Sequence, residues 1–298
     1  MKRMRPKPRR RALLLDVVDA ATLKAAQKST EEFLRFHSAY YADLARQRAA
    51  IQDELVGALR LSAQGPFEAR TLQRAVKYKH ALAPLSVAGS LKARDGGRFN
   101  VGALNAMFFP QFPALYLAVD RPTAEQELLS QDKSDAALTN EDFALTKPDS
   151  LSFVSVSVRL ERYVDLREPD LLKPFAEAIR QVEVSKESAK QARALGLREP
   201  RTVTNTAELV ESLLSAHWRF APRQCGVPAN SQVFGQLVEA AKVQGIVYPS
   251  KMTGRDCVAV FTRAFAGSDS FIALNDEPPS ATVLRRIDST NWRLAEQG

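Results

Sequence analysis

The sequence predicts an α+β fold in which a central, mainly antiparallel sheet is joined to an N-terminal helical segment and a helical insertion. Between Val154 and Leu160, apolar and polar residues alternate with period 2, which is typical of a half-buried antiparallel strand. Residues 17–62 instead repeat apolar side chains at helical spacing. A third stretch, residues 170–218, is mostly of helical character and separates two groups of short strand-like runs. Helices and strands are therefore both expected, in separate stretches of one chain.

The N-terminus is a basic tail, and it accounts for most of the net charge of +8. Residues 1–11 contain seven Lys or Arg and no acid, so the remainder has 35 basic against 34 acidic residues, a net charge of +1. We expect residues 1–16 to be disordered and solvated, although such a tail can contact phosphates. Ala12–Leu15 is too short an apolar run for a signal peptide, and no transmembrane candidate is visible, so the sequence predicts a soluble, cytoplasmic protein with no membrane contact.

Residues 17–65 form the predicted N-terminal helical segment. Ser29 and Glu32 have the spacing of a capping box, and Gly65–Pro66 ends the segment. Its apolar stripe consists of Phe33, Phe36, Tyr40, Leu44, Ile51, Leu55 and Leu59. Such a stripe is expected to be buried, either on the rest of the chain or in a homo-oligomer formed through this helix.

Residues 66–298 form the predicted main domain, with the helical insertion at about 166–218. Strands are expected around Ala114–Val119, Leu151–Tyr163, Ile246–Tyr248, Cys257–Phe261 and Phe271–Leu274. A helix is expected to begin near Ala124, and another to run from Ser231, as its N-terminal cap, to Gly245 at its C-terminal end.

Several familiar kinds of catalytic site are excluded by inspection. The chain has no phosphate-binding G-x-x-x-x-G-K-[ST] loop, no G-x-G-x-x-G, no H-E-x-x-H, no G-x-S-x-G and no C-x-x-C. Its three histidines are scattered, and its two cysteines, Cys225 and Cys257, fit a reducing compartment as small apolar residues. No metal site is expected.

Four local signals remain, in a fixed order. They are a glycine turn that presents an arginine (Gly96–Asn100), a strand with one phenol (Leu115–Ala118), a helix start (Ala124–Glu127) and a strand that ends in Pro-Ser (Gly245–Ser250). Each also has a purely structural interpretation. The first can be a turn with a solvated arginine, the second a core strand, the third the surface of a helix, and the fourth the end of a strand.

Together these signals resemble the RES domain family, which is named after its Arg, Glu and Ser residues. The GGRFN, LYLA, A-x-x-E and GIVYPS elements match the family's motifs in order, and Asp256–Phe261 resembles the strand that follows. The resemblance covers roughly residues 66–275. It departs from compact members in the long separation of Glu127 and Ser250, which are 123 positions apart. The family's early basic or aromatic position has three open candidates, namely Arg74, Tyr78 and Lys79.

The resemblance implies a fold similar to that of ADP-ribosyltransferases and a bacterial toxin of a toxin–antitoxin system. Such toxins consume NAD⁺ or transfer ADP-ribose, and an Xre-type helix-turn-helix antitoxin inhibits them. It follows that NAD⁺ is the substrate, that no cofactor is required, and that the chain contacts nucleic acid only indirectly. The reaction that the resemblance implies is cleavage of NAD⁺ at the nicotinamide–ribose bond, with water, phosphate or a protein side chain as acceptor.

The implied site has a binding part and a catalytic part. Arg98, which is also assigned to the catalytic part, suits the pyrophosphate, Asn100 lies beside it, and the ring of Tyr116 suits the flat nicotinamide cation. The carboxylate of Glu127 would stabilise an oxocarbenium-like centre, with Glu125 as its rival. Ser250 would fix the pose by hydrogen bonding to a ribose or phosphate oxygen.

An alternative from another functional class is a nucleic-acid-associated binding protein. It would use the basic N-terminal arm, and its RES-like part would be degenerate. This alternative predicts salt-dependent DNA or RNA binding that is lost with residues 1–11, and no turnover of NAD⁺.

Overall fold

A computed structural model describes residues 20–132 and 151–297, so the predicted tail of residues 1–16 lies outside the described residues. The chain forms two compact units. Of the described residues, the helical unit comprises 20–45 and 184–201, and the sheet unit comprises 46–132, 151–183 and 202–297.

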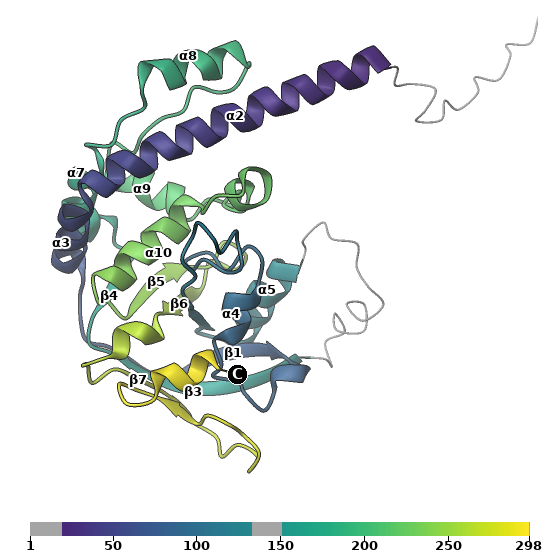
Figure 1. Ribbon diagram of the computed structural model, residues 1–298. Helices are drawn as coiled ribbons and strands as arrows, with labels where there is room; N and C mark the ends of the chain where they lie inside the picture. Colours follow the sequence, from purple (N-terminus) through teal and green to yellow (C-terminus); the bar gives the residue numbers. More distant parts are fainter. Residues whose placement is uncertain (1–19, 133–150, 298) are drawn as a thin grey trace, which may run out of the picture. The chain divides into compact units, whose positions relative to one another are not determined.

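In the helical unit, α2 (Ala20–Ala50, which continues into the sheet unit) runs alongside α8 (Lys186–Ala194) (Figure 1). The hydroxyl oxygen of Ser185 caps α8 by accepting a hydrogen bond from the Ser188 N–H. On α2 the ring-to-ring contacts join Phe33, Phe36, His37, Tyr40 and Tyr41. Of these residues, Phe36 is buried. The predicted stripe is therefore an aromatic cluster in its first half, and its role in oligomerisation stays a prediction.

The predicted capping box of Ser29 and Glu32 is wrong, because α2 has already begun at Ala20 and both residues lie inside the helix. The hydroxyl of the neighbouring Thr30 donates to the Ala26 carbonyl one turn earlier, a common arrangement for Thr in a helix interior. The helical path is interrupted at Ile51 and resumes as α3 (Gln52–Ser62).

The sheet unit is built on an eight-stranded sheet with the order β4-β5-β6-β2-β1-β3-β7-β8. Every neighbouring pair is antiparallel except β4 with β5. This arrangement confirms the predicted α+β class with a mainly antiparallel sheet. The strands are β1 (Phe67–Lys77), β2 (Leu115–Ala118), β3 (Leu151–Leu160), β4 (Tyr163–Asp165), β5 (Gly245–Pro249), β6 (Asp256–Val260), β7 (Phe271–Leu274) and β8 (Arg286–Ile287).

Each face of the sheet carries its own apolar core. Along β6, Cys257 and Ala259 contribute to one core, and Val258 and Val260 to the other, as the two-residue period of a strand requires. The first core includes side chains of α3, α7 (Lys173–Ile179), α9 (Thr206–Leu213) and α10 (Asn230–Ala240). The second includes residues of the 3₁₀ turns η5 (Thr262–Phe265) and η6 (Trp292–Glu296).

The boundaries of α10 differ from the prediction at both ends. The helix begins at Asn230, with Ala229 at the cap position and the Gln232 side chain accepting from the Ala229 N–H. It ends at Ala240, and Lys242, not a glycine, takes the left-handed conformation after it (φ 61°). Gly245 instead starts β5, where a Cβ would come within 2.7 Å of the Leu160 side chain. Its glycine is therefore required by close strand packing.

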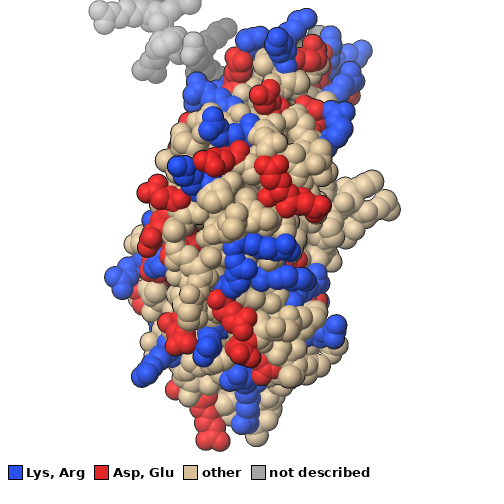
Figure 2. Space-filling view, turned by 90° about the vertical axis from the view of Figure 1, so that its left-hand side faces the viewer, with Lys and Arg blue, Asp and Glu red and all other residues tan. Residues whose placement is uncertain are grey.

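The remaining elements are short. They are η1 (Tyr78–His80), α4 (Ala88–Lys92), α5 (Arg121–Asp132), η3 (Pro169–Leu172) and η4 (Ala221–Cys225). Within the described ranges, no helix combines the length and apolar character needed to cross a membrane. Basic and acidic side chains are interspersed on the face shown in Figure 2.

Candidate functional site

A cavity of about 520 Å³ lies in the sheet unit, lined by parts of β1, η1, α4, the glycine turn, β2, α5, β5 and β6. Its volume is within the range of small-molecule sites. Tyr116 and Tyr248 supply aromatic surface, and Glu127 is the single acidic lining residue in the part of the chain that the structure describes. The basic lining residues are Arg74, Lys77, Lys79, His80 and Lys92. The cavity is therefore strongly cationic, with one carboxylate.

The glycine turn lies against the phenol of Tyr116. Gly96 has φ 69°, which disfavours other residues, and a Cβ on Gly97 would come within 2.3 Å of the Tyr116 hydroxyl oxygen. Asn100 is fully buried, and its side-chain oxygen accepts hydrogen bonds from the Gly97 N–H and the Tyr116 hydroxyl, both at 2.9 Å. Asn100 thus holds the turn and the ring together. This geometry favours a positioning role, and its predicted ligand contact stays a prediction.

The hydroxyl of Tyr116 has two hydrogen bonds to the protein. It donates to Asn100 and accepts from the Phe99 N–H at 2.9 Å. Burial raises the pKa of Tyr116, against the lowering effects of the Phe99 hydrogen bond and the charge of Arg98, so the phenol is neutral. Its ring lines the cavity from β2, where the prediction had put a nicotinamide-binding surface.

Glu127 and Ser250 are in direct contact. The Ser250 hydroxyl donates to Oε1 of Glu127 at 2.5 Å, and its oxygen accepts from the Met252 and Thr253 N–H groups. Ser250 is buried and Glu127 lines the cavity. The serine therefore fixes the carboxylate, and its predicted contact with a ribose or phosphate oxygen stays a prediction.

Local hydrogen bonds hold the two loops that carry this pair. The Asp120 side chain accepts from the Thr123 N–H at the start of α5. The hydroxyls of Thr123 and Thr253 are 3.0 Å apart and hydrogen bonded, and Arg255 forms an ion pair with Asp120. The loop after β5 is thereby fixed to the start of the helix that carries the carboxylate.

Glu125 and Glu127 differ in their relation to the cavity. Glu127 is among its lining residues, whereas Glu125, also part-buried, is not. The geometry favours Glu127 as the functional carboxylate.

Arg98 is not among the residues that line the cavity. Its Nη1 donates to the carbonyl oxygens of Ser215 at 2.9 Å and Leu213 at 3.4 Å, and its guanidinium lies 5.8 Å from the ring centre of Trp218. Burial lowers the pKa of Arg98, and the charge of Glu127 opposes this effect. Arg98 is thus near enough to Glu127 to act on it electrostatically, and its contact with pyrophosphate stays a prediction.

The three candidates for the family's early basic or aromatic position differ in their relation to the cavity. Arg74 and Lys79 line the cavity, whereas Tyr78 is outside its lining and 69% exposed. Nη2 of Arg74 donates to the Ser86 carbonyl, while its buried Nε has no hydrogen-bond acceptor among the described residues. Burial lowers the pKa of Arg74 to about 10. An inward, incompletely bonded guanidinium is suited to an anionic ligand.

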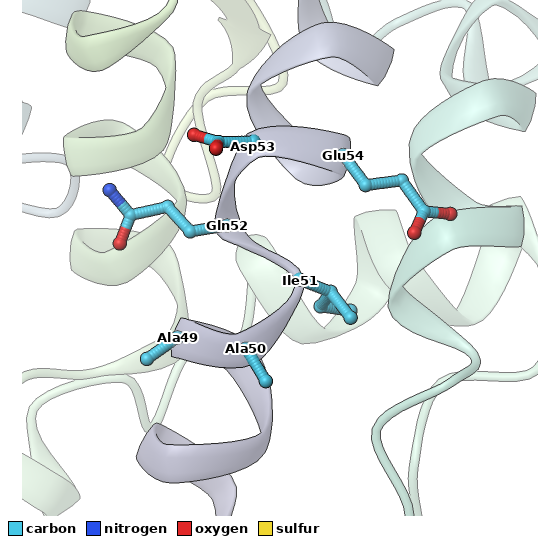
Figure 3. A pocket seen from close by; sticks show the side chains of 6 residues that line it. All are labelled: Ala49, Ala50, Ile51, Gln52, Asp53 and Glu54. Atoms are coloured by element: carbon cyan, nitrogen blue, oxygen red, sulfur yellow. The ribbon is translucent and has the colours of Figure 1, made fainter.

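A second hollow, of about 340 Å³, lies where α2 passes into α3 and is lined by residues 49–54. Gln52 and Asp53 point to one side of the helix and Glu54 to the other (Figure 3). Glu54 accepts a hydrogen bond from Gln181. This hollow is open and has no cationic lining residue, so it does not fit an anionic nucleotide.

No group of side chains in the described ranges has the composition and proximity of a metal site. Cys257 lines the cavity, but it is buried, and burial together with the charge of Glu127 raises its thiol pKa. It is therefore a neutral wall of the cavity and not a thiolate nucleophile.

Comparisons with known proteins identify the family of this chain. The model of the RES domain matches residues 70–280, so the chain belongs to the RES domain family. Among solved structures, a chain of the M. tuberculosis MbcT–MbcA toxin–antitoxin complex matches with 15% identity and a TM-score of 0.41, covering 82% of this chain and 98% of that chain. The comparison with curated proteins gave no match.

Sequence reasoning missed much of the cationic lining and one aromatic wall. Lys77 and His80 lie on either side of Tyr78 and Lys79, two of the candidates for the early position. The basic run Lys77–His80 could therefore have indicated these lining residues from the sequence. Tyr248 belongs to the quoted GIVYPS motif but was not assigned a role. Lys92, which joins them from α4, had no sequence signal.

Proposed function

We propose that this protein is a RES-domain toxin that cleaves NAD⁺ at the nicotinamide–ribose bond. The observation that carries the proposal is one cavity whose described lining is cationic, with two aromatic residues and a single carboxylate that Ser250 holds in place. A dinucleotide requires these features, because its pyrophosphate is anionic, its nicotinamide is a flat cation, and its reacting carbon becomes positive.

In the proposed reaction the bond between the ribose C1′ and the nicotinamide nitrogen breaks, and nicotinamide leaves with the bonding electron pair. Positive charge develops at C1′ and the ring oxygen, where the carboxylate of Glu127 stabilises it. The acceptor oxygen then bonds to C1′, and its proton passes to Glu127 or to solvent. Water as acceptor yields ADP-ribose, phosphate yields ADP-ribose phosphate, and a protein side chain yields an ADP-ribosylated protein.

Positions of the supporting residues follow from the same geometry. In the proposed complex, Tyr116 and Tyr248 would contact the nicotinamide and Arg74 with the neighbouring lysines the phosphates, and their common position in the cavity lining with Glu127 supports these roles. The family resemblance supports an Xre-type antitoxin as protein partner, and a cytoplasmic location, where NAD⁺ is abundant. The nucleic-acid alternative depends on the basic arm, which lies outside the described residues.

The direct test is incubation of the purified full chain with NAD⁺, with nicotinamide release followed by chromatography. Release that is abolished in Glu127→Gln and retained in Arg293→Ala, which is outside the site, would support the proposal. No release by the wild type, either alone or with phosphate or a host cell extract as acceptor, would contradict it. The second product identifies the acceptor.

A further inference from the structure

Arg219 lies in the segment between α9 and η4, and it shares one indole with Arg98. The guanidinium carbon of Arg219 is 4.4 Å from the ring centre of Trp218, and that of Arg98 is 5.8 Å from the same centre. Trp218 is itself buried, with 7% of its surface exposed. Both guanidinium groups therefore contact one fixed aromatic side chain.

Neither guanidinium has a carboxylate at ion-pair distance among the described residues. The guanidinium of Arg98 donates hydrogen bonds to two backbone carbonyls. Among the described residues, the guanidinium of Arg219 has one such interaction, its contact with the ring of Trp218. Asp95, the acid whose charge most raises the pKa of Arg219, is already paired with Arg223 at 2.7 Å. The charge of Arg98 lowers the pKa of Arg219, and two partly buried cations that repel each other are stabilised by an anion that binds both.

The pair is close to the reacting end of the cavity. The charges of Arg98 and Arg219 both lower the pKa of Tyr116, opposing its burial, and the charge of Glu127 raises the pKa of each arginine. Burial is the main cause of the lowered pKa of Arg219, and the charges of Arg223 and Arg98 add to it. An anion bound between the two arginines would therefore lie within electrostatic range of the tyrosine and the carboxylate.

We infer that Arg219 is a further substrate-binding residue, which completes with Arg98 a site for a phosphate group of the dinucleotide. This inference rests on the proposed function for the identity of the ligand. Planar guanidinium groups bind phosphate oxygens through two parallel hydrogen bonds, and a phosphate held here would be near the ribose that Glu127 serves. The segment between α9 and η4 would then contribute directly to the site.

The chain provides a matched control for this residue. Trp292-Arg293 repeats the Trp-Arg pair, with the Arg293 guanidinium 4.7 Å from the Trp292 ring centre. Arg293 is exposed and belongs to η6, outside the cavity lining. Arg293→Ala therefore removes a similar contact from an equivalent local pair without altering the proposed site.

The experiment measures binding of inorganic pyrophosphate and of ADP-ribose by calorimetry in the full-length Glu127→Gln protein, which removes turnover from the measurement. Arg219→Ala should weaken binding of both by about 10- to 100-fold, the range expected for a hydrogen bond to a charged group. Arg219→Lys should recover part of the loss, and Arg293→Ala should leave affinity unchanged. With Glu127 intact, Arg219→Ala should raise the KM for NAD⁺ by more than it lowers kcat.

Equal affinity of Arg219→Ala and Arg293→Ala for pyrophosphate and ADP-ribose would overturn the inference, as would failure of the parent protein to bind either. If Arg219→Ala does not fold, as judged by its Tm, Arg219→Lys decides the question, with unchanged affinity as the contradicting result. Pyrophosphate binding does not require turnover. Loss of pyrophosphate binding in Arg219→Ala would therefore support the inference even if no nicotinamide were released, a result that would contradict the proposed function alone.

Discussion

The residues that line the cavity form two groups, which differ in how their polar side chains are held. On the hydrogen-bonded side, Tyr116 is held by Asn100 and the Phe99 backbone, and Glu127 is held by Ser250. On the cationic side, the buried Nε of Arg74 has no acceptor among the described residues, and the neighbouring lining residues are Lys77, Lys79, His80 and Lys92.

The first arrangement holds a carboxylate in a fixed position before the reaction begins, whereas the second attracts an anionic ligand by its positive charge. A carboxylate with a fixed position can stabilise charge that develops at one point in space, because it need not reorganise during the reaction. A group of cations provides a field that favours any suitably placed phosphate and requires less exact positions. Variants on the hydrogen-bonded side should therefore alter turnover, and variants on the cationic side should alter affinity.

The largest effect is expected for Glu127→Gln, which retains the shape of the side chain and removes its charge. Nicotinamide release should fall by about 10²- to 10⁴-fold, the range for a positioned acid–base group, with a much smaller change in NAD⁺ binding. Glu125→Gln is the matched control on the same helix. Wild-type turnover in Glu127→Gln together with loss in Glu125→Gln would reverse the assignment of the two acids.

Arg74→Ala should show the opposite pattern. Loss of a guanidinium that meets the pyrophosphate should raise the KM for NAD⁺ by about 10- to 100-fold and affect kcat less. Arg70→Ala, an exposed position on the same strand, controls for the change in net charge and should leave KM unaltered. If kcat falls while KM is unchanged, Arg74 acts on turnover, and the proposal that the cationic side determines affinity is wrong.

Gly97→Ala tests how closely the glycine turn fits the tyrosine. The new Cβ would lie 2.3 Å from the Tyr116 hydroxyl oxygen, so the ring or the turn must move. We expect the free energy of unfolding to fall by about 1–3 kcal/mol, as for other overpacked sites, and turnover to fall with it. Gly57→Ala, inside α3 with open space at its Cβ, should instead leave stability unchanged or raise it by up to about 1 kcal/mol. Chemical denaturation of the two variants provides the comparison.

The sequence was most informative where structure depends on neighbours in the chain. The alternation in β3 predicted an antiparallel strand, and β3 pairs antiparallel with β1 and β7. The motifs led to a glycine turn, a strand and a helix that meet at one cavity, because turn and strand patterns are local.

Other features depend on contacts between distant segments, and the sequence did not reveal them. Lys92 joins the cationic side only because α4 lies beside the end of β1, and Arg219 approaches Arg98 only through the packing of Trp218. Helix ends were also misjudged: the left-handed position after α10 is occupied by Lys242, whereas the sequence rule favours glycine there. Local preferences of this kind are weak enough for tertiary packing to override them.

The smallest predicted effect is a pH dependence that arises on the cationic side. Burial lowers the pKa of His80 below its usual value, and the charges of Lys79, Lys77, Arg74 and Lys92 lower it further. A bound pyrophosphate offsets those charges and favours the protonated imidazole, so the pKa of His80 rises in the complex and binding takes up a proton. The affinity for NAD⁺ should therefore increase by a few-fold, at most about tenfold for one pKa unit, as pH falls through the region below about 6.5.

The contribution of His80 to stability has the opposite sign in the free protein. Its pKa is lower folded than unfolded, so the unfolded chain binds the proton more readily, and this contribution is lost as pH falls below about 6.5. Replacing His80 by Gln should flatten the pH profile of KM and remove part of the acid loss in Tm. Both are measured against the wild type at the same ionic strength, since salt also screens the lysines. If the KM profile of His80→Gln superimposes on that of the wild type, the phosphates do not lie against this side of the cavity.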